Sequence, residues 1–544
     1  MDVILKLATR SATTHYMSDS VVSIDAALAA GDVAGAVVAA RTALAEGDTD
    51  PFVLNLVAWD TIQTGDPIAA EAMIRGALAT PPHDPGLLTT LGLALRRQLR
   101  FSEALRAFDA AIAEAPDYAV AWLERGFTLH QGNSLRLADA SYRRAAMLDA
   151  HQAPAFAGVA SIAASQGETA VAREFAGKAL AIDPHDAVAH CAIARCDTAG
   201  GDPGASVDRL QALLQHPGLT AENHSAAQSL LGDALAKVNR PADAVAAYIS
   251  AKSSLTARFP HLLTVERQLR LAERLTAEVT ADTGNWSATG ADDRRGHGFL
   301  LGFPRSGTTL IETILASVVG VEALEELPTL AAAEAAYLAP ADGTRKLAEA
   351  KIEAMATMRS AYWHRVADFG VDTNARMFID MDPMKSLDLP LIGRLFGTAH
   401  IIVMRRDPRD VVLSCFRQNF AASPMALEFT TLERTAHFYD ATMQLQYECL
   451  ARLPNPVLEL WYEELIDDFD GVTQQLCSFL GLPWSEKLRD FSDTARRRDV
   501  STASVGQVRQ GLFNGSGQWR RFETEMAPVL PVLAPWVKLF GYDG

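Results

Sequence analysis

The 544-residue sequence is poor in cysteine, in basic relative to acidic residues, and in long apolar runs. Its five cysteines lack zinc-like pairing and are too few for a disulfide framework, which favours a reducing, cytoplasmic setting. With 66 acidic against 49 basic residues the formal charge is −17, so we expect no nucleic-acid partner. No secretory signal follows Met1, and no apolar run is long enough to predict a membrane span.

What is present indicates a folded chain with more than one domain. Hydrophobic residues make up 49% and charged residues 21%, which is enough apolar material for sizeable cores. Alanine is abundant before about residue 250 and less so afterwards, so composition alone suggests where the chain divides.

A sequence repeat occupies the first half. One copy lies within residues 90–116 and the next follows 34 residues later; after a short insertion the pattern resumes near residue 232. The matching positions are Gly92, Ala104, Phe108 and Ala111; Gly126, Ala138, Tyr142 and Ala145; and Gly232, Ala244, Tyr248 and Ala251. Roughly six copies over residues 20–255 resemble tetratricopeptide (TPR) repeats, which implies paired antiparallel helices and a groove for a peptide or protein segment. The ligand of such a groove is not readable from the sequence.

The second half begins after a polar, glycine-rich stretch at residues 283–298, TGNWSATGADDRRGHG. Helical periodicity continues up to about residue 278, so this stretch predicts a connection between domains. We therefore expect a helical repeat domain at residues 1–278, a linker at 279–297 and a second domain at 298–544.

A glycine loop opens the second domain. The apolar residues 299–301 precede Gly302-Phe-Pro-Arg-Ser-Gly-Thr-Thr309, and a buried-helix pattern follows. A strand, glycine loop and helix in this order form an anion site from backbone N–H groups and a helix N-terminus. The lysine of a nucleoside triphosphatase is replaced by Thr308, which disfavours ATP or GTP hydrolysis; the loop's cation is Arg305. The plain alternative is a structural turn.

A second basic segment, HIIVMRRDPRDVVLSCFRQNF at residues 400–420, predicts a strand followed by a helix in a parallel α/β sheet. Arg406 at the strand end and Ser414, eight residues later on the helix, could converge on a second phosphate. Alternatively, Arg406, Asp407 and Arg409 form a solvated, salt-bridged turn.

Together these motifs resemble sulfotransferases that use 3′-phosphoadenosine 5′-phosphosulfate (PAPS), over roughly residues 296–543. The resemblance is strongest to the tyrosylprotein sulfotransferase-like branch that is often fused to TPR repeats in bacteria. It implies an α-solenoid joined to a P-loop-like α/β domain with a mostly parallel sheet. By motif, it places Arg305, Ser306, Gly307, Thr308 and Thr309 on the phosphosulfate, Arg406 and Ser414 on the 3′-phosphate, and Tyr462, Ser504, Gln507, Val508, Arg509 and Trp519 around the nucleotide.

The resemblance also implies the catalytic groups. The branch uses a glutamate after the loop helix as general base, and this chain has Leu324-Glu-Glu-Leu-Pro328 there, so Glu326 is the candidate and Glu325 the alternative. No metal is required by the family. The family's lysine near the leaving oxygen is replaced by Met381, and either Lys385 or Arg305 could supply that charge.

The expected reaction is sulfuryl transfer from PAPS to an acceptor hydroxyl, with tyrosine of a protein or peptide held by the repeats as one candidate. The alternative is a TPR binding scaffold whose sulfotransferase-like domain binds nucleotide but turns over weakly. Acceptor identity and oligomeric state are not encoded in these motifs.

Overall fold

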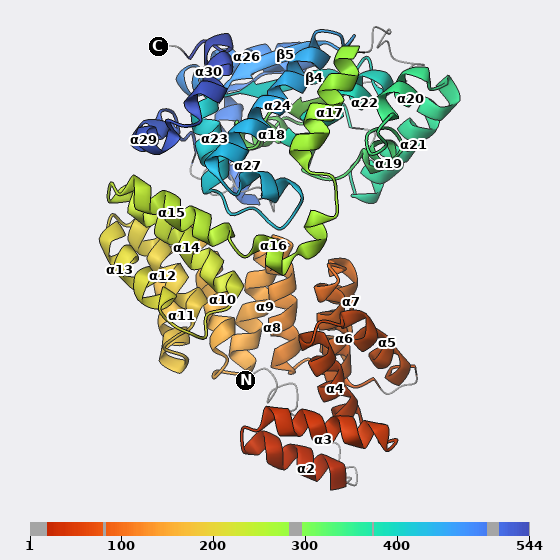
Figure 1. The fold of residues 1–544 in the computed structure, drawn as a ribbon, viewed down its shortest axis with the longest axis vertical. Coiled ribbons are helices and arrows are strands. Elements are labelled where there is room, and N and C mark those ends of the chain that lie inside the picture. Colours follow the sequence, from red (N-terminus) through yellow and green to blue (C-terminus); the bar gives the residue numbers. More distant parts are fainter. Residues whose placement is uncertain (1–18, 80–82, 282–295, 373–374, 498–510, 543–544) are drawn as a thin grey trace. The chain divides into compact units, whose positions relative to one another are not determined.

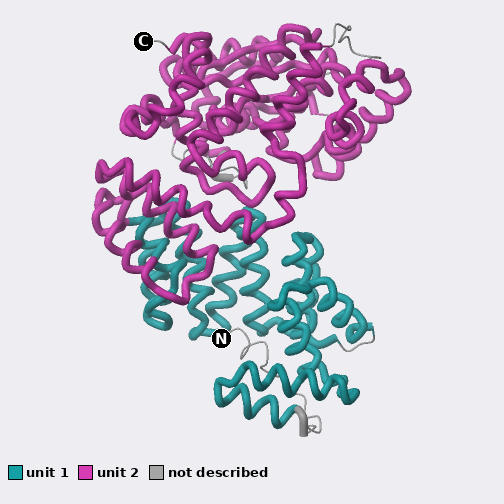
Figure 2. Tube along the Cα trace, viewed as in Figure 1, with its two compact units in different colours: residues 1–196 teal, residues 197–544 magenta. Residues whose placement is uncertain are grey.

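The computed structural model describes residues 19–79, 83–281, 296–372, 375–497 and 511–542. The chain forms two compact units, Met1–Cys196 and Asp197–Gly544, which are described separately (Figure 2). Within the described ranges, no helix has the length and apolarity needed to cross a membrane.

Unit 1 consists of helices that pack in consecutive pairs (Figure 1). Its helices are α2 (Asp19–Ala29), α3 (Val33–Ala45), α4 (Pro51–Gln63), α5 (Pro67–Ala77), α6 (Pro85–Arg97), α7 (Phe101–Glu114), α8 (Ala119–Gln131), α9 (Leu135–Leu148), α10 (Ala153–Ser165), α11 (Thr169–Ile182) and α12 (Ala187–Ala199), the last of which crosses the unit boundary. The predicted array of helical repeats is confirmed.

The turn inside each helix pair has a left-handed residue. The φ angle is positive at Gly31, Gly65, Leu99, Asn133, Gly167 and Gly201, a series with a period of 34 residues. The next residue then bonds back across the helix end: Arg100 N donates to Leu95 O at 3.0 Å, and Ser134 N donates to Leu129 O at 2.8 Å. This bond satisfies a carbonyl that the helix end would otherwise leave without a partner.

Each repeat glycine makes room for an aromatic ring in its partner helix. A Cβ atom on Gly92 would lie 2.4 Å from a Phe108 ring carbon, and one on Gly126 would lie 2.7 Å from Tyr142. Both rings are buried, so close helix approach explains the spacing of glycine and aromatic residues in the sequence.

Unit 2 starts with further helices and continues into a sheet. The helices before the sheet are α13 (Pro203–Leu214), α14 (Ala221–Lys237), α15 (Pro241–Lys252), α16 (Leu255–Arg258), η1 (Pro260–Leu263) and α17 (Gln268–Ala281). Helix α17 packs against α24 (Leu432–Leu450), and Leu275 and Val279 share a core cluster with Phe299 of the sheet. Most of the expected linker 279–297 lies outside the described residues, so that boundary stays a prediction.

The sheet is parallel throughout, with strand order β2-β3-β1-β4-β5. Its strands are β1 (His297–Leu301), β2 (Val321–Glu325), β3 (Met377–Met381), β4 (His400–Arg405) and β5 (Val457–Trp461). The central strand β1 lies between β3 and β4, with Leu300 in register with both Met381 and Ile402. The expected parallel α/β domain is confirmed.

Helices cover the sheet and continue the chain from strand to strand. They are α18 (Thr308–Ala316), α19 (Ala331–Tyr337), α20 (Gly343–Glu349), α21 (Ile352–Asp368), η2 (Pro383–Asp388), α22 (Leu389–Leu395), α23 (Pro408–Arg417), η3 (Met425–Phe429), α24, α25 (Tyr462–Asp467), α26 (Phe469–Leu480), η4 (Glu486–Asp490), α27 (Phe491–Arg497), η5 (Gln518–Phe522), α29 (Glu523–Met526) and α30 (Leu530–Leu539). Because the strands are parallel, their carboxyl ends meet at one edge, where ligands of open α/β sheets bind.

Candidate functional site

The glycine loop lies between β1 and α18, at the carboxyl edge of the central strand. Gly307 has φ 110° and precedes α18 without a side-chain cap, so the first N–H groups of this helix face the loop. A Cβ atom on Gly302 would lie 2.5 Å from Ser306 Oγ, and one on Gly307 would lie 2.9 Å from a Tyr462 ring carbon. Glycine is therefore strongly favoured at Gly307, where φ is positive, whereas a side chain at Gly302 would have to displace the Ser306 hydroxyl.

Two buried polar atoms at the loop have no hydrogen-bond partner among the described residues. They are Ser306 Oγ, in a side chain that is 2% exposed, and Arg406 Nε. A buried polar group without a partner costs free energy, so sites of this kind are completed by a ligand or water. An anion that accepts hydrogen bonds fits both donors.

Arginines from two segments converge with Ser414. Arg305 Nε donates to Ser414 Oγ at 3.1 Å, and Arg406 donates from Nη1 to Arg305 O at 2.9 Å. Arg406 also donates from Nη2 to Gly515 O at 2.7 Å and lies 4.7 Å from the centroid of the Tyr462 ring. The structure thus brings together Arg305, Arg406, Ser414 and Tyr462, which the sequence had singled out separately.

The charges at this point favour an anion. Burial lowers the pKa of Arg305, and the nearby guanidinium groups of Arg406 and Arg417 lower it further. An arginine stays protonated in proteins, so this clustered positive charge favours binding of an anion over loss of a proton. Arg305 is also left-handed, with φ 71°, an unfavourable conformation for a residue with a side chain.

Glu326 follows β2 and, with φ 48°, is the second left-handed residue other than glycine among the described residues of the sheet domain. Its N–H donates to Met381 O at 2.7 Å, which ties the turn to β3. Its side chain is exposed, but the protein atoms around its carboxyl still desolvate it, and this desolvation, together with Asp382 and Glu325, raises the pKa of Glu326 to about 8. Arg305 acts in the opposite direction, so Glu326 lies within electrostatic range of the phosphate loop. Such a group can accept a proton near neutral pH.

Glu325, the alternative base, is the last residue of β2 and is half-buried in register with Met381. Met381 itself is fully buried within β3. These positions distinguish the two glutamates: Glu326 stands in the turn beyond the strand, whereas Glu325 remains part of the sheet.

Lys385 is buried in a polar network beneath this turn. Its Nζ donates to Asp380 Oδ1 at 2.7 Å and to Leu327 O at 3.1 Å. The other Asp380 oxygen accepts from Thr329 Oγ1 at 2.7 Å and from Tyr362 OH at 2.9 Å. Lys385 therefore bonds directly to the segment that follows Glu326, and its ammonium is neutralised by Asp380.

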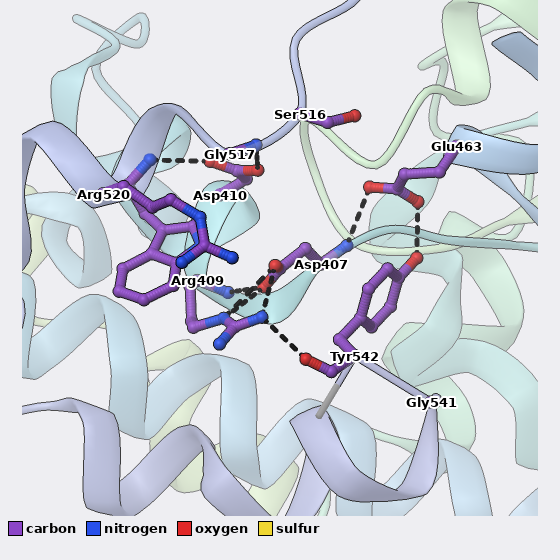
Figure 3. A pocket seen from close by; sticks show the side chains of 10 residues that line it. Asp407, Arg409, Asp410, Glu463, Ser516, Gly517, Arg520, Gly541 and Tyr542 are labelled. Carbon is purple, nitrogen blue, oxygen red and sulfur yellow. Dashed lines mark hydrogen bonds and ion pairs between the residues drawn. The ribbon is translucent and has the colours of Figure 1, made fainter. Parts of the chain in front are cut away.

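A recess of about 380 Å³ is lined by Asp407, Arg409 and Asp410, which follow Arg406 in the sequence (Figure 3). Asp410 accepts there from the backbone N–H groups of Gly517, at 2.6 Å, and Trp519, at 2.8 Å. Arg409 lies over the Trp519 ring at 4.3 Å and donates to Asp407 Oδ2 at 2.7 Å. These contacts hold the 515–519 segment beside Arg406, so Trp519 is a buried packing residue in this arrangement.

Several sequence expectations have different outcomes here. Ser504, Gln507, Val508 and Arg509 lie outside the described residues. Asp410 was missed, although its position one residue after the Asp-Pro-Arg run could have suggested a helix-start carboxylate that receives backbone N–H groups. Asp407 and Arg409 do form the ion pair of the alternative interpretation, but the pair is largely buried and not solvated, and Arg406 donates instead to the phosphate loop.

Comparison with known proteins shows similarity over parts of the chain. Residues 299–486 match the model of the sulfotransferase family. That segment contains the glycine loop, both glutamates, Lys385, Arg406 and Ser414.

Relatives with named functions align with part of the chain. A putative protein-tyrosine sulfotransferase of Caenorhabditis elegans is 27% identical over 170 residues, which cover 30% of this chain and 64% of the relative. Protein-tyrosine sulfotransferase 2 of Gallus gallus is 25% identical over 195 residues, covering 35% of this chain and 52% of the relative. An uncharacterized protein of Aquifex aeolicus is 31% identical over 245 residues, or 43% of this chain, and the alignment spans only 32% of that protein's length.

Solved structures similar to the chain include a tetratricopeptide repeat protein from Parabacteroides merdae, with 15% identity and a TM-score of 0.33. It is matched over 43% of this chain and 91% of its own. PilW, a type IV pilus biogenesis factor, has 20% identity and a TM-score of 0.32, over 38% of this chain and 93% of its own. The assignment of the repeats rests on the helix pairs themselves.

Proposed function

We propose that this chain, whose residues 299–486 belong to the sulfotransferase family, transfers a sulfuryl group from PAPS to an acceptor hydroxyl. The observation that carries the proposal is the convergence of Arg305, Arg406 and Ser414 at a glycine loop with two unpartnered buried donors within the described part of the chain. A doubly charged nucleotide end suits such a cluster of guanidinium and hydroxyl groups.

In this proposal, the loop residues Arg305 to Thr309 and the N-terminus of α18 hold the 5′-phosphosulfate. Arg406 and Ser414 hold the 3′-phosphate, with Tyr462 beside them. When bound, PAPS supplies an activated sulfuryl group, which leaves 3′-phosphoadenosine 5′-phosphate (PAP) as product. Arg305 neutralises charge at the leaving oxygen, since Lys385 is engaged with Asp380.

Glu326 is the proposed general base. It takes the proton from the acceptor hydroxyl as the new bond from oxygen to sulfur forms. Its raised pKa suits this role, because a base is most effective when its pKa is close to the working pH. Lys385 supports the turn from beneath through Leu327 O, which keeps Glu326 in its left-handed conformation.

The acceptor is proposed to be a tyrosine hydroxyl in a protein or peptide segment bound by the helical repeats. Two things support this: the named relatives are protein-tyrosine sulfotransferases, and repeat arrays present extended binding surfaces. A cytoplasmic location is also proposed, on the low cysteine content.

One observation favours the second candidate, a scaffold that binds nucleotide with weak turnover. Met381 stands where the family has a lysine, and the nearby Lys385 ammonium is already neutralised by Asp380. Without a free lysine, charge at the leaving oxygen depends on Arg305.

Transfer from radiolabelled PAPS to a tyrosine-containing peptide and to a small phenol tests the proposal. We expect Glu326→Gln to lower turnover by at least about a hundredfold while PAP binding is retained, because general-base contributions are of this size. The matched control is Glu325→Gln, one residue earlier, which should retain most activity. Label transfer by Glu326→Gln at the wild-type rate would reject Glu326 as base; PAP binding without any transfer would favour the scaffold.

A further inference from the structure

Helix α23 contacts the last helix pair of the repeat pattern, α14 and α15, and it also bonds to the phosphate loop. On the loop side, Ser414 Oγ accepts from Arg305 Nε at 3.1 Å, and Cys415 Sγ donates to Pro304 O at 3.1 Å. The position of α23 therefore sets the position of Ser414 and supports the loop.

The same C-terminal turn of α23 also lies against α14 and α15. Arg417 Nε donates to Tyr248 OH at 3.1 Å, and its Nη2 donates to Asp233 Oδ1 at 3.1 Å. Tyr248 OH donates to the same Asp233 oxygen at 2.8 Å, which closes a three-residue network. Lys252 Nζ donates to Phe416 O and lies 4.6 Å from the Phe416 ring centroid.

These contacts use residues in which the last helix pair departs from earlier repeats. The residue after the repeat glycine is Leu93 or Phe127 in earlier pairs but Asp233 here. The residue after the last repeat alanine is Ile112 or Ala146 in earlier pairs but Lys252 here. Charged residues thus replace apolar ones where α14 and α15 meet α23.

The aromatic position shows the same specialisation. In earlier pairs it is Phe108, which has no hydroxyl, or Tyr142, whose hydroxyl lies 3.4 Å from His130 Nδ1 within its own pair. The Tyr248 ring fills the space left by Gly232, where a Cβ atom would lie 2.4 Å away, while its hydroxyl donates to Asp233 of its own pair and also accepts from Arg417 of α23. One residue therefore serves both repeat packing and attachment of α23.

We propose that Arg417 is a positioning residue for the nucleotide site, held by Asp233 and Tyr248 of the last helix pair. Arg417 acts through α23 by fixing the position of Ser414, which the proposed function assigns to the 3′-phosphate. This inference therefore rests on that function. In this proposal, α14 and α15 do more than end the repeat array, because they help to position the nucleotide site. Its attachment orders the loop side of α23 before nucleotide binds, which lowers the ordering cost of binding.

The test is calorimetric titration of the full chain with PAP and with AMP, which lacks the 3′-phosphate. Tyr248→Phe keeps the ring and changes no charge, so it isolates positioning from electrostatics. We expect PAP to bind about threefold to tenfold more weakly, the range of one hydrogen bond, with AMP binding unchanged. The matched control is Tyr142→Phe, the same change in an earlier repeat, which should leave both affinities unchanged.

Asp233→Asn provides a second variant in case Tyr248→Phe fails to fold. Its control is Asp243→Asn, which breaks a surface pair with Arg240, at 2.7 Å, in the same helix pair. Weaker PAP binding by Asp233→Asn supports positioning; tighter binding would mean that only the removed negative charge matters, and would overturn it. Wild-type affinity for PAP in Tyr248→Phe, or equal losses for PAP and AMP, would overturn it as well. No PAP binding by the wild-type chain would instead reject the proposed function.

Discussion

Left-handed residues with side chains occur in two regions of the molecule, and they differ in kind. In the helical repeats, Leu99 and Asn133 belong to a series with a period of 34 residues whose other members are glycines. In the sheet domain, Arg305 and Glu326 belong to no such series. Arg305 follows β1 and Glu326 follows β2, so both lie at the carboxyl edge of the sheet, within electrostatic range of each other. The same conformation is turn geometry in the first region and a property of the proposed site in the second.

The two regions differ in whether the side chain of the left-handed residue is needed. A glycine would serve the repeat turns as well as or better than Leu99, since the turn needs only a backbone conformation. At Arg305 and Glu326 glycine would relieve strain but remove the guanidinium and the carboxylate. Predictions can therefore separate the two groups by asking whether a change affects ligand binding, turnover or only stability.

The largest effect on nucleotide affinity is expected for Arg305→Ala. The variant keeps a side chain with left-handed strain but loses the guanidinium, so PAP affinity should fall by about tenfold to a hundredfold, the range for charge-assisted hydrogen bonds. Calorimetric titration measures it. Asn133→Ala, a change at a left-handed residue of the repeats, should leave PAP affinity unchanged. If both variants bind PAP like wild type, Arg305 serves only the turn, and the proposed difference between the two regions is wrong.

The pH dependence of turnover sharpens the role of Glu326. With the pKa of Glu326 raised to about 8, its carboxyl is mostly protonated below that pH, and only the ionised form can accept a proton. We expect kcat/KM to rise about tenfold per pH unit up to about pH 8 and then to level off. A profile that is flat between about pH 6 and pH 8 would contradict a base with this pKa.

The smallest effect is expected for Leu99→Gly. Leu99 has φ 62° and is 60% exposed, so the substitution relieves backbone strain and removes little buried surface. The free energy of unfolding should rise by about 0.5–1 kcal/mol in urea denaturation, with PAP affinity unchanged. Lower stability would show that the Leu99 side chain has a packing role that outweighs the strain.

The sequence predicted local features well. The repeat register followed from Gly92 and Phe108, because close helix approach leaves a mark at fixed spacing. The glycine loop followed from the order of strand, glycines and helix around residues 302–309, because this loop depends on neighbours in the chain. The parallel sheet followed from apolar runs that end in polar segments.

Long-range contacts were harder to predict. The contacts of Lys385 with Leu327 O, of Arg417 with Asp233, and of Asp410 with the N–H of Trp519 depend on how distant segments fold together. No sequence periodicity indicates such contacts. The same residue types form buried and solvated ion pairs, so the sequence does not distinguish the two. The distinction between Glu325 and Glu326 likewise required the end of β2 to be located.

The central claim is that the site recognises a nucleotide with a 3′-phosphate. Calorimetric titration of the full chain with PAP, alongside AMP and the Arg406→Ala variant, tests it most directly. The account predicts tight PAP binding by wild type, much weaker binding of AMP, and a loss of the preference for PAP in Arg406→Ala, whose guanidinium is assigned to the 3′-phosphate. Equal binding of PAP and AMP, or a preference that survives Arg406→Ala, would contradict it.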